Sequence, residues 1–544
     1  MLAIFVLGFV LRVPTFLRPL LSDDEAIYAT TADAMARGDL LYRDVVDHKP
    51  PLIYHVYQAG FAALGRYNTQ GAHVLVILSV LLTAGFLFAT KGHDGRGDSR
   101  QHPEVANSSR GFALAAAGLF LVFSTTWHDY DALSANCELF LLAPQTIAAW
   151  LLLRDLSTRP RPFHGALGFA THLAVGALIG TSALFKYQGL TFLGASIGML
   201  IWWVILGRAS GSWAVTSALC HVIGALAPAA LYLLWCAASG NAEASVYWFK
   251  FNFSYVGAGL TGIAAIARGL RRTLLIGGVA LVPYSFGVAA AVVASSGMVR
   301  VMRRRLRGVR SFDPADASVP PPSVALGLLW LATSAVAVTA GGRFFGHYFH
   351  LILAPLCLLA APAFCLFWSK GWSYRAPLLA LCALPAFFFF ALATFGRPLA
   401  AAVDERDPPY DDVATRIAEL TAPDERIFVW GNSPQLYVLA RRPMGTRFSF
   451  CNYMTGESPG TPTETGQRNA DTNQLPAAWD MLFADLDRRR PALFVDAAAA
   501  GWDGYAKYPL ARYPRLRAYV DANYRQVDVR AGVVLYRRWP KRDN

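Results

Sequence analysis

Eleven apolar segments, each near the length of a membrane-spanning helix, occupy most of residues 1–397 of this 544-residue chain. A helix needs about 20 mostly apolar residues to cross the hydrocarbon core of a bilayer. The chain is 55% apolar and 13% aromatic, which is far too apolar for a soluble protein of this size. The sequence therefore predicts a polytopic α-helical membrane protein. The expected spans are 1–17, 72–90, 111–126, 138–153, 165–183, 188–206, 213–237, 272–298, 322–340, 348–368 and 376–396.

The first span, 1–17, lacks both a basic leading region and a small-residue cleavage site, so we expect a retained helix rather than a signal peptide. Lysine and arginine are unevenly divided between the loops that follow. If the N-terminus is cytoplasmic, the inside loops hold clusters such as 300–310, whereas the outside loop 127–137 holds no cation. The positive-inside rule favours this orientation, which places 18–71 and the C-terminal tail outside. It also explains the net charge of +13 as membrane topology rather than nucleic-acid binding.

The segment after the first span is the most acid-rich interval of the first hundred residues. Ser22 and Glu25 have the spacing of a capping box, so a helix is expected to begin here and to end at Gly38. Asp23, Asp24 and Glu25 then lie in its first turn. Two interpretations stay open at this point, because carboxylates in a first turn are favourable in any helix, whatever its function.

A second helix is expected from Pro50-Pro51 to Gly65, since proline is tolerated in a first turn. Lys49 precedes it, and a cation beside the free N–H groups of a helix N-terminus is a suitable seat for a phosphate. The alternative is that Lys49 is only a solvated loop charge.

Four further outside features carry polar or aromatic residues. The loop 127–138 bears Asp129, Asp131, Asn136 and Glu138, and it is either a second functional acidic cluster or a solvated loop in which Asn136 forms a turn or caps a helix. Lys186 occupies a very short turn at membrane depth, where a cation either pairs with an anion or snorkels to the interface.

The remaining two features are an aromatic loop and a late helix end. The loop 238–271 is rich in aromatic residues, which suit either an interfacial belt or the wall of a lipid or sugar groove. These residues, with two polar neighbours, are Tyr247, Trp248, Phe249, Lys250, Asn252, Phe253 and Tyr255. Arg343, His347 and Tyr348 lie at the outer end of a late span, where we expect a binding role at most for Arg343 and His347.

Composition changes after about Pro398, where apolar runs shorten and charges appear. Residues 398–544 are therefore predicted to form a soluble outside α/β domain, and 1–397 the transmembrane domain with a first outside loop at 18–71. Expected elements are helices at 411–420, 435–439 and 477–489, strands at 426–431 and 491–495, a closing hairpin at 524–537 and a polar loop at 456–473. No glycine-rich nucleotide fingerprint is present.

Several of these motifs resemble polyprenyl-phosphate-dependent glycosyltransferases of the GT-C superfamily, in the branch related to protein O-mannosyltransferases and the lipid A aminoarabinose transferase. The similar elements are Asp24-Glu25 followed by Tyr28, Gly38, Tyr42 and His48-Lys49-Pro50-Pro51, then Ala135-Asn136-Cys137-Glu138, Phe185-Lys186-Tyr187-Gln188-Gly189, and Arg343 with His347-Tyr348. The chain departs from the family pattern at Phe185, where the family has threonine.

The resemblance implies a membrane glycosyltransferase that moves a sugar from a polyprenyl-phosphate donor to a glycan, lipid or protein acceptor, with inversion, at the outer face of a bacterial cytoplasmic membrane. It implies catalysis by Asp24, with Glu25 either catalytic or shaping the helix end. The donor phosphate would contact Lys49, Lys186, Arg343 and His347; Asp129, Asp131, Asn136 and Glu138 would orient the acceptor; and Tyr42, His48 and Tyr348 are further motif positions. No metal or cofactor is expected, although a divalent ion at the second acidic cluster is an open alternative. The rival functions are a transporter or flippase of lipid-linked saccharides and a non-catalytic envelope assembly protein.

Overall fold

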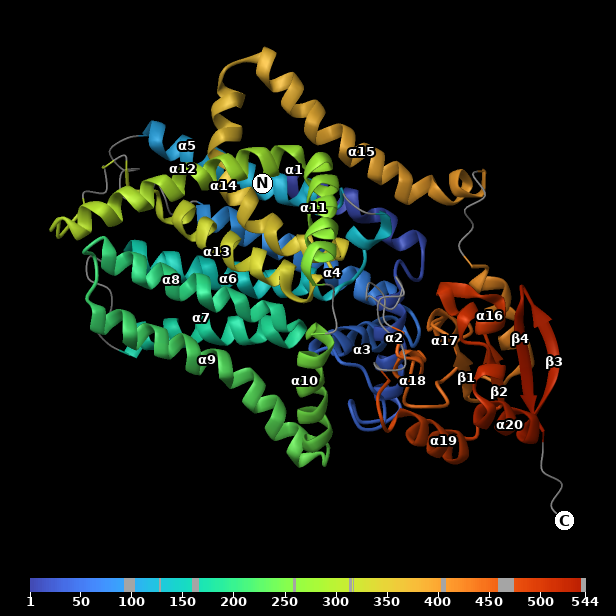
Figure 1. The fold of residues 1–544 in the computed structure, drawn as a ribbon. Helices are drawn as coiled ribbons and strands as arrows, with labels where there is room; N and C mark the ends of the chain where they lie inside the picture. Colours follow the sequence, from blue (N-terminus) through green and yellow to red (C-terminus); the bar gives the residue numbers. More distant parts are fainter. Residues whose placement is uncertain are drawn as a thin grey trace. The chain divides into compact units, whose positions relative to one another are not determined.

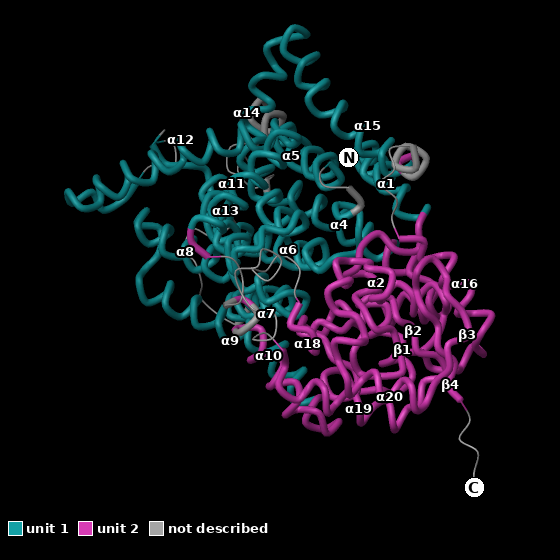
Figure 2. Tube along the Cα trace, turned by 45° about the vertical axis from the view of Figure 1, so that its right-hand side comes forward, with its two compact units in different colours: residues 1–17, 74–235, 263–394 teal, residues 18–73, 236–262, 395–544 magenta. Residues whose placement is uncertain are grey.

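The computed structural model describes residues 1–91, 103–126, 129–158, 166–257, 261–312, 316, 318–402, 408–457 and 474–539 (Figure 1). The chain forms two compact units (Figure 2). The first comprises residues 1–17, 74–235 and 263–394, and the second comprises 18–73, 236–262 and 395–544. The division at 397/398 expected from the sequence stays a prediction. The expected loop 456–473 falls almost wholly outside the described residues.

The first unit is helical, as the apolar segments predicted. Nine helical stretches of the described chain are long and apolar enough to cross a membrane, and two shorter apolar helical stretches, Leu2–Leu17 and Arg110–Phe123, coincide with the other expected spans. The helices are α1 (Leu2–Arg12), α4 (Gln70–Lys91), α5 (Pro103–Phe123), α6 (Cys137–Thr158), α7 (Ala166–Phe185), α8 (Phe192–Ile205), α9 (Gly211–Ala238), α11 (Gly262–Val279), α12 (Leu281–Leu306), α13 (Pro322–Thr339), α14 (His350–Ser369) and α15 (Trp372–Ala402). Short 3-10 turns join them at η1 (Val13–Leu17), η3 (Asp129–Ala132), η4 (Tyr187–Thr191), η5 (Ala340–Gly342) and η6 (Gly346–Phe349).

Burial separates the central helices of this unit from the peripheral ones. Every residue from His350 to Ala361 of α14 is buried, which is the pattern of a helix surrounded by other helices. By contrast, α12 and α15 leave large apolar side chains such as Val293, Phe387 and Phe388 exposed, as expected of surfaces that meet lipid. Small residues allow α7 and α9 to approach closely, since a Cβ added to Gly180 would lie 2.2 Å from the carbonyl oxygen of Ala225.

Two expectations for the segment 238–298 are wrong. The expected loop 238–271 is mostly helical, because it contains α10 (Ala242–Gly257) and the first half of α11. The expected span 272–298 is not one helix, because the chain breaks at Ala280 (φ −94°, ψ 43°) between α11 and α12. The candidate span therefore runs from Leu281 to Leu306.

The second unit contains a four-stranded sheet in the order β1-β2-β4-β3. Strands β1 (Ile427–Trp430) and β2 (Leu493–Asp496) are parallel, whereas β4 (Val533–Arg538) is antiparallel to β2 and to β3 (Tyr524–Arg530). All residues of β1 and β2 are buried, which explains their continuous apolar runs. The expected strands, helices and closing hairpin of this α/β region are confirmed.

The same unit includes the helices of the first outside loop. These are α2 (Asp23–Ala36) and α3 (Leu52–Leu64), and α10 also belongs to this unit. The other elements are α16 (Tyr410–Leu420), α17 (Gln435–Leu439), α18 (Asn452–Thr455), α19 (Ala478–Arg489), α20 (Pro514–Asn523), η9 (Ala498–Ala500), η10 (Trp502–Lys507) and η11 (Leu510–Arg512). The α/β region holds α2 at its N-terminus, where Gln435 Nε2 donates to Asp23 Oδ1 over 2.5 Å.

Candidate functional site

The acidic helix α2 begins where its capping signal predicted. The Ser22 side chain accepts a hydrogen bond from the backbone N–H of Glu25 (3.4 Å), and Glu25 Oε2 accepts one from the N–H of Leu21 (2.7 Å). Two otherwise unpaired donors are thereby satisfied at the helix start. The helix ends at Ala36, two residues before the expected Gly38, which has a left-handed φ of +98°. The second expected helix is α3, with Pro51 and Gly65 as its caps.

Asp24 and Lys49 form an ion pair that joins α2 to the residue before α3. Lys49 Nζ lies 2.6 Å from Asp24 Oδ1, and the hydroxyl of Tyr28 donates to Asp24 Oδ2 over 3.2 Å. The ammonium also lies 4.5 Å from the centre of the Tyr28 ring, within cation–π range. The pair is only partly buried, since the Asp24 side chain is 26% exposed and that of Lys49 12% exposed. Both charges are thus accessible to a ligand.

Hydrogen bonds among nearby residues of the chain stabilise the loop that carries Lys49. Tyr42 adopts a left-handed φ of +71°, and its hydroxyl donates to the carbonyl oxygen of Lys49 (2.7 Å). Asp47 is buried and accepts from the N–H of His48 (2.6 Å) and from the Tyr54 hydroxyl (2.8 Å). Burial alone would raise the pKa of Asp47, but its pKa is lowered because His48, Lys49 and Tyr54 stabilise the carboxylate. A charged Asp47 therefore anchors the segment that presents Lys49.

Glu25 occupies a different environment from its neighbour Asp24. Its carboxylate is fully buried, and Oε1 lies 3.1 Å from Nε2 of the equally buried His73. A carboxylate enclosed in this way, and also bonded to the N–H of Leu21, is suited to fixing the helix start rather than to contacting a substrate. Sequence reasoning missed His73. Its position, an ionisable side chain at the beginning of an expected membrane span, was the signal that could have identified it.

The first unit brings together residues from the second acidic loop and the late helix end. His347 Nδ1 lies 3.0 Å from both carboxylate oxygens of Asp131, and the N–H of His347 donates to Asp131 Oδ2 (3.2 Å). Asn136 Nδ2 donates to Asp131 Oδ1 over 3.1 Å. Arg272 of α11 is also close enough to interact electrostatically with Asp131, which sequence reasoning missed. The side chain of Asp129 lies outside the part of the chain that is described.

Glu138 and Lys186 form the buried centre of this cluster. The two side chains make a short ion pair, and His347 Nε2 lies 3.8 Å from Glu138 Oε1. Lys186 Nζ also lies 4.0 Å from the centre of the Tyr348 ring. The anion that a lysine at this depth requires is therefore Glu138. Arg343, four residues before His347, is itself buried.

Arg12 is a second residue of the first unit whose contacts sequence reasoning did not foresee. It is fully buried, and its Nη2 donates to the carbonyl oxygens of Ser124 (3.2 Å) and Ala132 (3.3 Å). His350 Nε2 lies 3.1 Å from the same Ser124 oxygen. These contacts hold the residue Ser124 before the second acidic loop and Ala132 in its middle, and the signal in the sequence was one arginine in an otherwise apolar segment.

Possible metal ligands and the cysteines are the last side chains to consider in the part of the chain that is described. Among the described residues, no three His, Cys, Asp or Glu side chains are grouped so that they could hold a metal ion. Five of the seven cysteines are buried.

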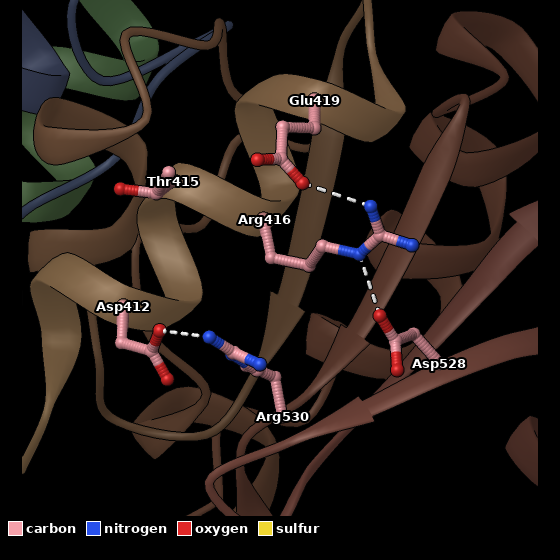
Figure 3. A pocket seen from close by; sticks show the side chains of 6 residues that line it. All are labelled: Asp412, Thr415, Arg416, Glu419, Asp528 and Arg530. Atoms are coloured by element: carbon pink, nitrogen blue, oxygen red, sulfur yellow. Dashed lines mark hydrogen bonds and ion pairs between the residues drawn. The ribbon is translucent and has the colours of Figure 1, made fainter.

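A shallow cavity on the second unit lies between α16 and β3 (Figure 3). It is lined by Asp412, Thr415, Arg416, Glu419, Asp528 and Arg530. Arg416 bonds Asp528 (2.5 Å) and Glu419 (2.8 Å), and Arg530 bonds Asp412 (2.6 Å). Three carboxylates and two arginines line the cavity, and all five pair with one another, so these ion pairs link a helix to a strand.

The fold is similar to that of solved structures over nearly the whole chain. The crystal structure of ArnT from Cupriavidus metallidurans bound to undecaprenyl phosphate has a TM-score of 0.60 and 16% sequence identity, with 99% of this chain and 98% of that one covered. The apo structure of the same protein has a TM-score of 0.56 and 16% identity, with 98% and 97% covered. The chain shares the fold of these structures. The fold expected from the sequence, a polytopic α-helical protein with a C-terminal α/β region, is thereby confirmed, and with its apolar helices the chain is a multi-pass membrane protein. No protein-family model and no curated protein sequence matches the chain.

Proposed function

We propose that this chain is an integral membrane glycosyltransferase that moves a sugar from a polyprenyl-phosphate donor to an acceptor hydroxyl. One observation carries the proposal. Lys49 and the partly exposed Asp24 form an ion pair at the start of two adjacent helices, in a chain whose fold is similar to that of an ArnT structure bound to undecaprenyl phosphate. A cation suits the phosphate of such a donor, and a carboxylate beside it suits the acceptor hydroxyl.

The transfer step follows from these two groups. The Asp24 carboxylate accepts the proton of the acceptor hydroxyl as its oxygen attacks the anomeric carbon of the sugar. The bond between that carbon and the phosphate oxygen breaks, and the polyprenyl phosphate leaves with the bonding electrons and one additional negative charge. Lys49 stabilises this growing charge, so no acid is needed to protonate the leaving group. A single displacement of this kind inverts the anomeric centre.

The ion pair also links donor binding to catalysis. When no donor is bound, Asp24 and Lys49 neutralise each other over 2.6 Å. A donor phosphate competes for the ammonium of Lys49 and so releases the Asp24 carboxylate. The base therefore becomes available when the donor is in place.

The other site residues have supporting roles in this proposal. Within the first unit, we propose Lys186, Arg343 and His347 as candidate phosphate-binding residues and Asp131, Asn136 and Glu138 as candidate acceptor-binding residues. The mechanism includes no metal or cofactor, so activity should survive chelation of divalent ions. We further propose that the N-terminus is cytoplasmic and that residues 398–544 lie outside the bacterial inner membrane, as the distribution of basic loops favours.

The experiment is a mass-spectrometric assay of polyprenyl-phosphate sugars in membranes that contain the wild-type protein or Asp24→Asn at equal abundance. We expect the wild type alone to consume a donor and to form a new glycosylated product, which identifies the acceptor. Donor consumption by both proteins would exclude Asp24 as the base. Consumption by neither, across the hexose and pentose donors of the membrane, would refute the proposed function.

A further inference from the structure

Helix α10 has two faces of opposite character. Asn241 at its N-terminal end, Ser245 and Trp248 are buried, and they share one side with Asn252 because their spacing of four, three and four residues follows the helical period. The other side is exposed and mostly apolar. It consists of Glu243 in the first turn and of Val246, Tyr247, Phe249, Lys250, Phe253 and Val256.

The buried face of α10 holds the loop that leads to Lys49. Asn241 Nδ2 donates to the carbonyl oxygen of Leu41 (3.0 Å), and Trp248 Nε1 donates to that of Tyr42 (3.1 Å). Asn252 Nδ2 makes a short hydrogen bond to the carbonyl oxygen of His48, the residue before Lys49. Three donors from one helix thus satisfy three backbone acceptors of an eight-residue segment, 41–48.

These contacts act directly on the backbone that carries Lys49. Tyr42, whose carbonyl oxygen is held by Trp248, also donates its hydroxyl to the carbonyl oxygen of Lys49. The position of the Lys49 ammonium beside Asp24 therefore depends on α10 through two routes, one through Tyr42 and one through His48. Tyr42 itself is in a left-handed conformation, which persists only where surrounding contacts hold it.

The exposed face of α10 matches the interface of a bilayer. Tyrosine, phenylalanine and lysine on one face of a helix are the residues enriched where apolar rings meet lipid headgroups. The chain supports this placement, because α10 begins at Ala242, four residues after the candidate span α9 ends at Ala238. Four residues reach at most about 14 Å, so the start of α10 lies close to the end of that span. At the other end, α11 follows with its exposed residues Ile263 and Ile266.

We propose that α10 lies in the headgroup region of the bilayer with its apolar face against lipid, and that its opposite face positions the loop that carries Lys49. The lipid surface would then help to fix the geometry of the candidate phosphate site. The role of this positioning in catalysis rests on the proposed function. The contact of α10 with lipid and its hydrogen bonds to the loop do not.

Depth in the membrane tests the outer face. A spin label at Phe253→Cys (Phe253 is 69% exposed) is compared with one at Val527→Cys, an apolar position of β3 that is 45% exposed. Both variants lack Cys365 and Cys382, the two cysteines that are not buried. In lipid nanodiscs, we expect oxygen to relax the label at 253 and a water-soluble nickel chelate to relax the label at 527. Equal access of the nickel chelate to both labels would overturn the proposal, as would protection at 253 that occurs only after polyprenyl phosphate is added.

Chemical reactivity of Lys49 tests the inner face without reference to activity. In Asn252→Ala, we expect modification of Lys49 by an amine-reactive reagent to accelerate about 5- to 10-fold, the change that loss of one hydrogen bond produces in a local opening equilibrium. Asn252→Gln, which keeps an amide donor, should restore much of the protection. Lys250, already exposed on the same helix, is the internal control and should react at an unchanged rate, while unchanged reactivity of the buried Cys451 shows that the fold persists. An unchanged rate at Lys49 would refute the positioning role, whether or not the protein proves to be a transferase.

Discussion

Because Asp24 and Lys49 form an ion pair, we expect a substitution of Asp24 and a substitution of Lys49 to change the affinity for polyprenyl phosphate in opposite directions. If a donor phosphate displaces Asp24 from Lys49, then Asp24→Asn removes a competitor and should tighten the binding of polyprenyl phosphate. Lys49→Met removes the cation and should weaken the same binding. Asp24→Asn should therefore bind polyprenyl phosphate more tightly and yet lose sugar transfer. A substitution that only damaged the site would weaken both.

The size of the effect follows from the geometry. Two unit charges 2.6 Å apart attract each other by about 6 kcal/mol at an effective dielectric constant of about 20, before the cost of desolvation. Because both side chains are partly exposed, the net value is nearer that of one charge-assisted hydrogen bond, about 1.5–3 kcal/mol. Part of this free energy is recovered when Lys49 pairs with the phosphate in place of Asp24. We therefore expect Asp24→Asn to raise affinity by about 1–2 kcal/mol, which is roughly 5- to 30-fold.

The assay is equilibrium binding of polyprenyl phosphate to the purified protein in nanodiscs. Asp23→Asn is the matched control, because it removes the same charge one residue away but Asp23 is bonded to Gln435. Its effect should be clearly smaller than that of Asp24→Asn. If Asp24→Asn weakens binding, or if it has the same effect as Asp23→Asn, the competition between carboxylate and phosphate is refuted.

Three other predictions concern stability. His73→Ala leaves the fully buried Glu25 without its imidazole partner and should lower the free energy of unfolding by about 3–5 kcal/mol, visible as a lower thermal midpoint; no change would contradict the buried pair. Burial raises the pKa of Asp496 to about 6, so the folded state holds a proton that the unfolded state releases at lower pH. Stability should consequently fall by about 3 kcal/mol as pH rises from about 4 to 6 and stay level above that, and Asp496→Asn should remove this slope in a denaturant titration repeated at each pH. Gly180→Ala would put a Cβ 2.2 Å from a backbone oxygen of α9 and should cost about 1–3 kcal/mol, whereas Gly278→Ala, with open space around it, should cost nothing; equal effects would contradict the close helix contact.

Local chemistry explains which elements could be predicted from the sequence. The start of α2 depends on a side chain and an N–H three residues apart, and the cap of α3 on a proline, so both are readable from short patterns. Strands β1 and β2 are buried on both faces and therefore are continuous apolar runs. The spans of the first unit are predictable for a similar reason, because lipid requires long apolar helices.

Partner choice could not be read in the same way. Glu25 and Asp24 are adjacent and chemically alike in the sequence, yet one is buried against His73 and the other remains accessible beside Lys49. The difference is set by partners 25 and 48 positions away, which only the folded chain brings together. Likewise, the segment 238–271 suggested an aromatic loop, although the four-three-four spacing of Asn241, Ser245, Trp248 and Asn252 was a signal of α10. The break at Ala280 lies between Gly277-Gly278 and Pro283, in the first turn of α12, but these signals stand inside a long apolar run.

The most direct test of transfer from a lipid-linked sugar is made in detergent micelles, where a transporter has no two sides to act between. The purified protein is incubated with a polyprenyl-phosphate sugar and the acceptor identified in membranes, and free polyprenyl phosphate and the glycosylated product are quantified by mass spectrometry. We expect the wild type to release equimolar amounts of polyprenyl phosphate and of a product with inverted anomeric configuration, and Asp24→Asn to release neither. An intact donor in the presence of the wild-type protein would contradict this expectation.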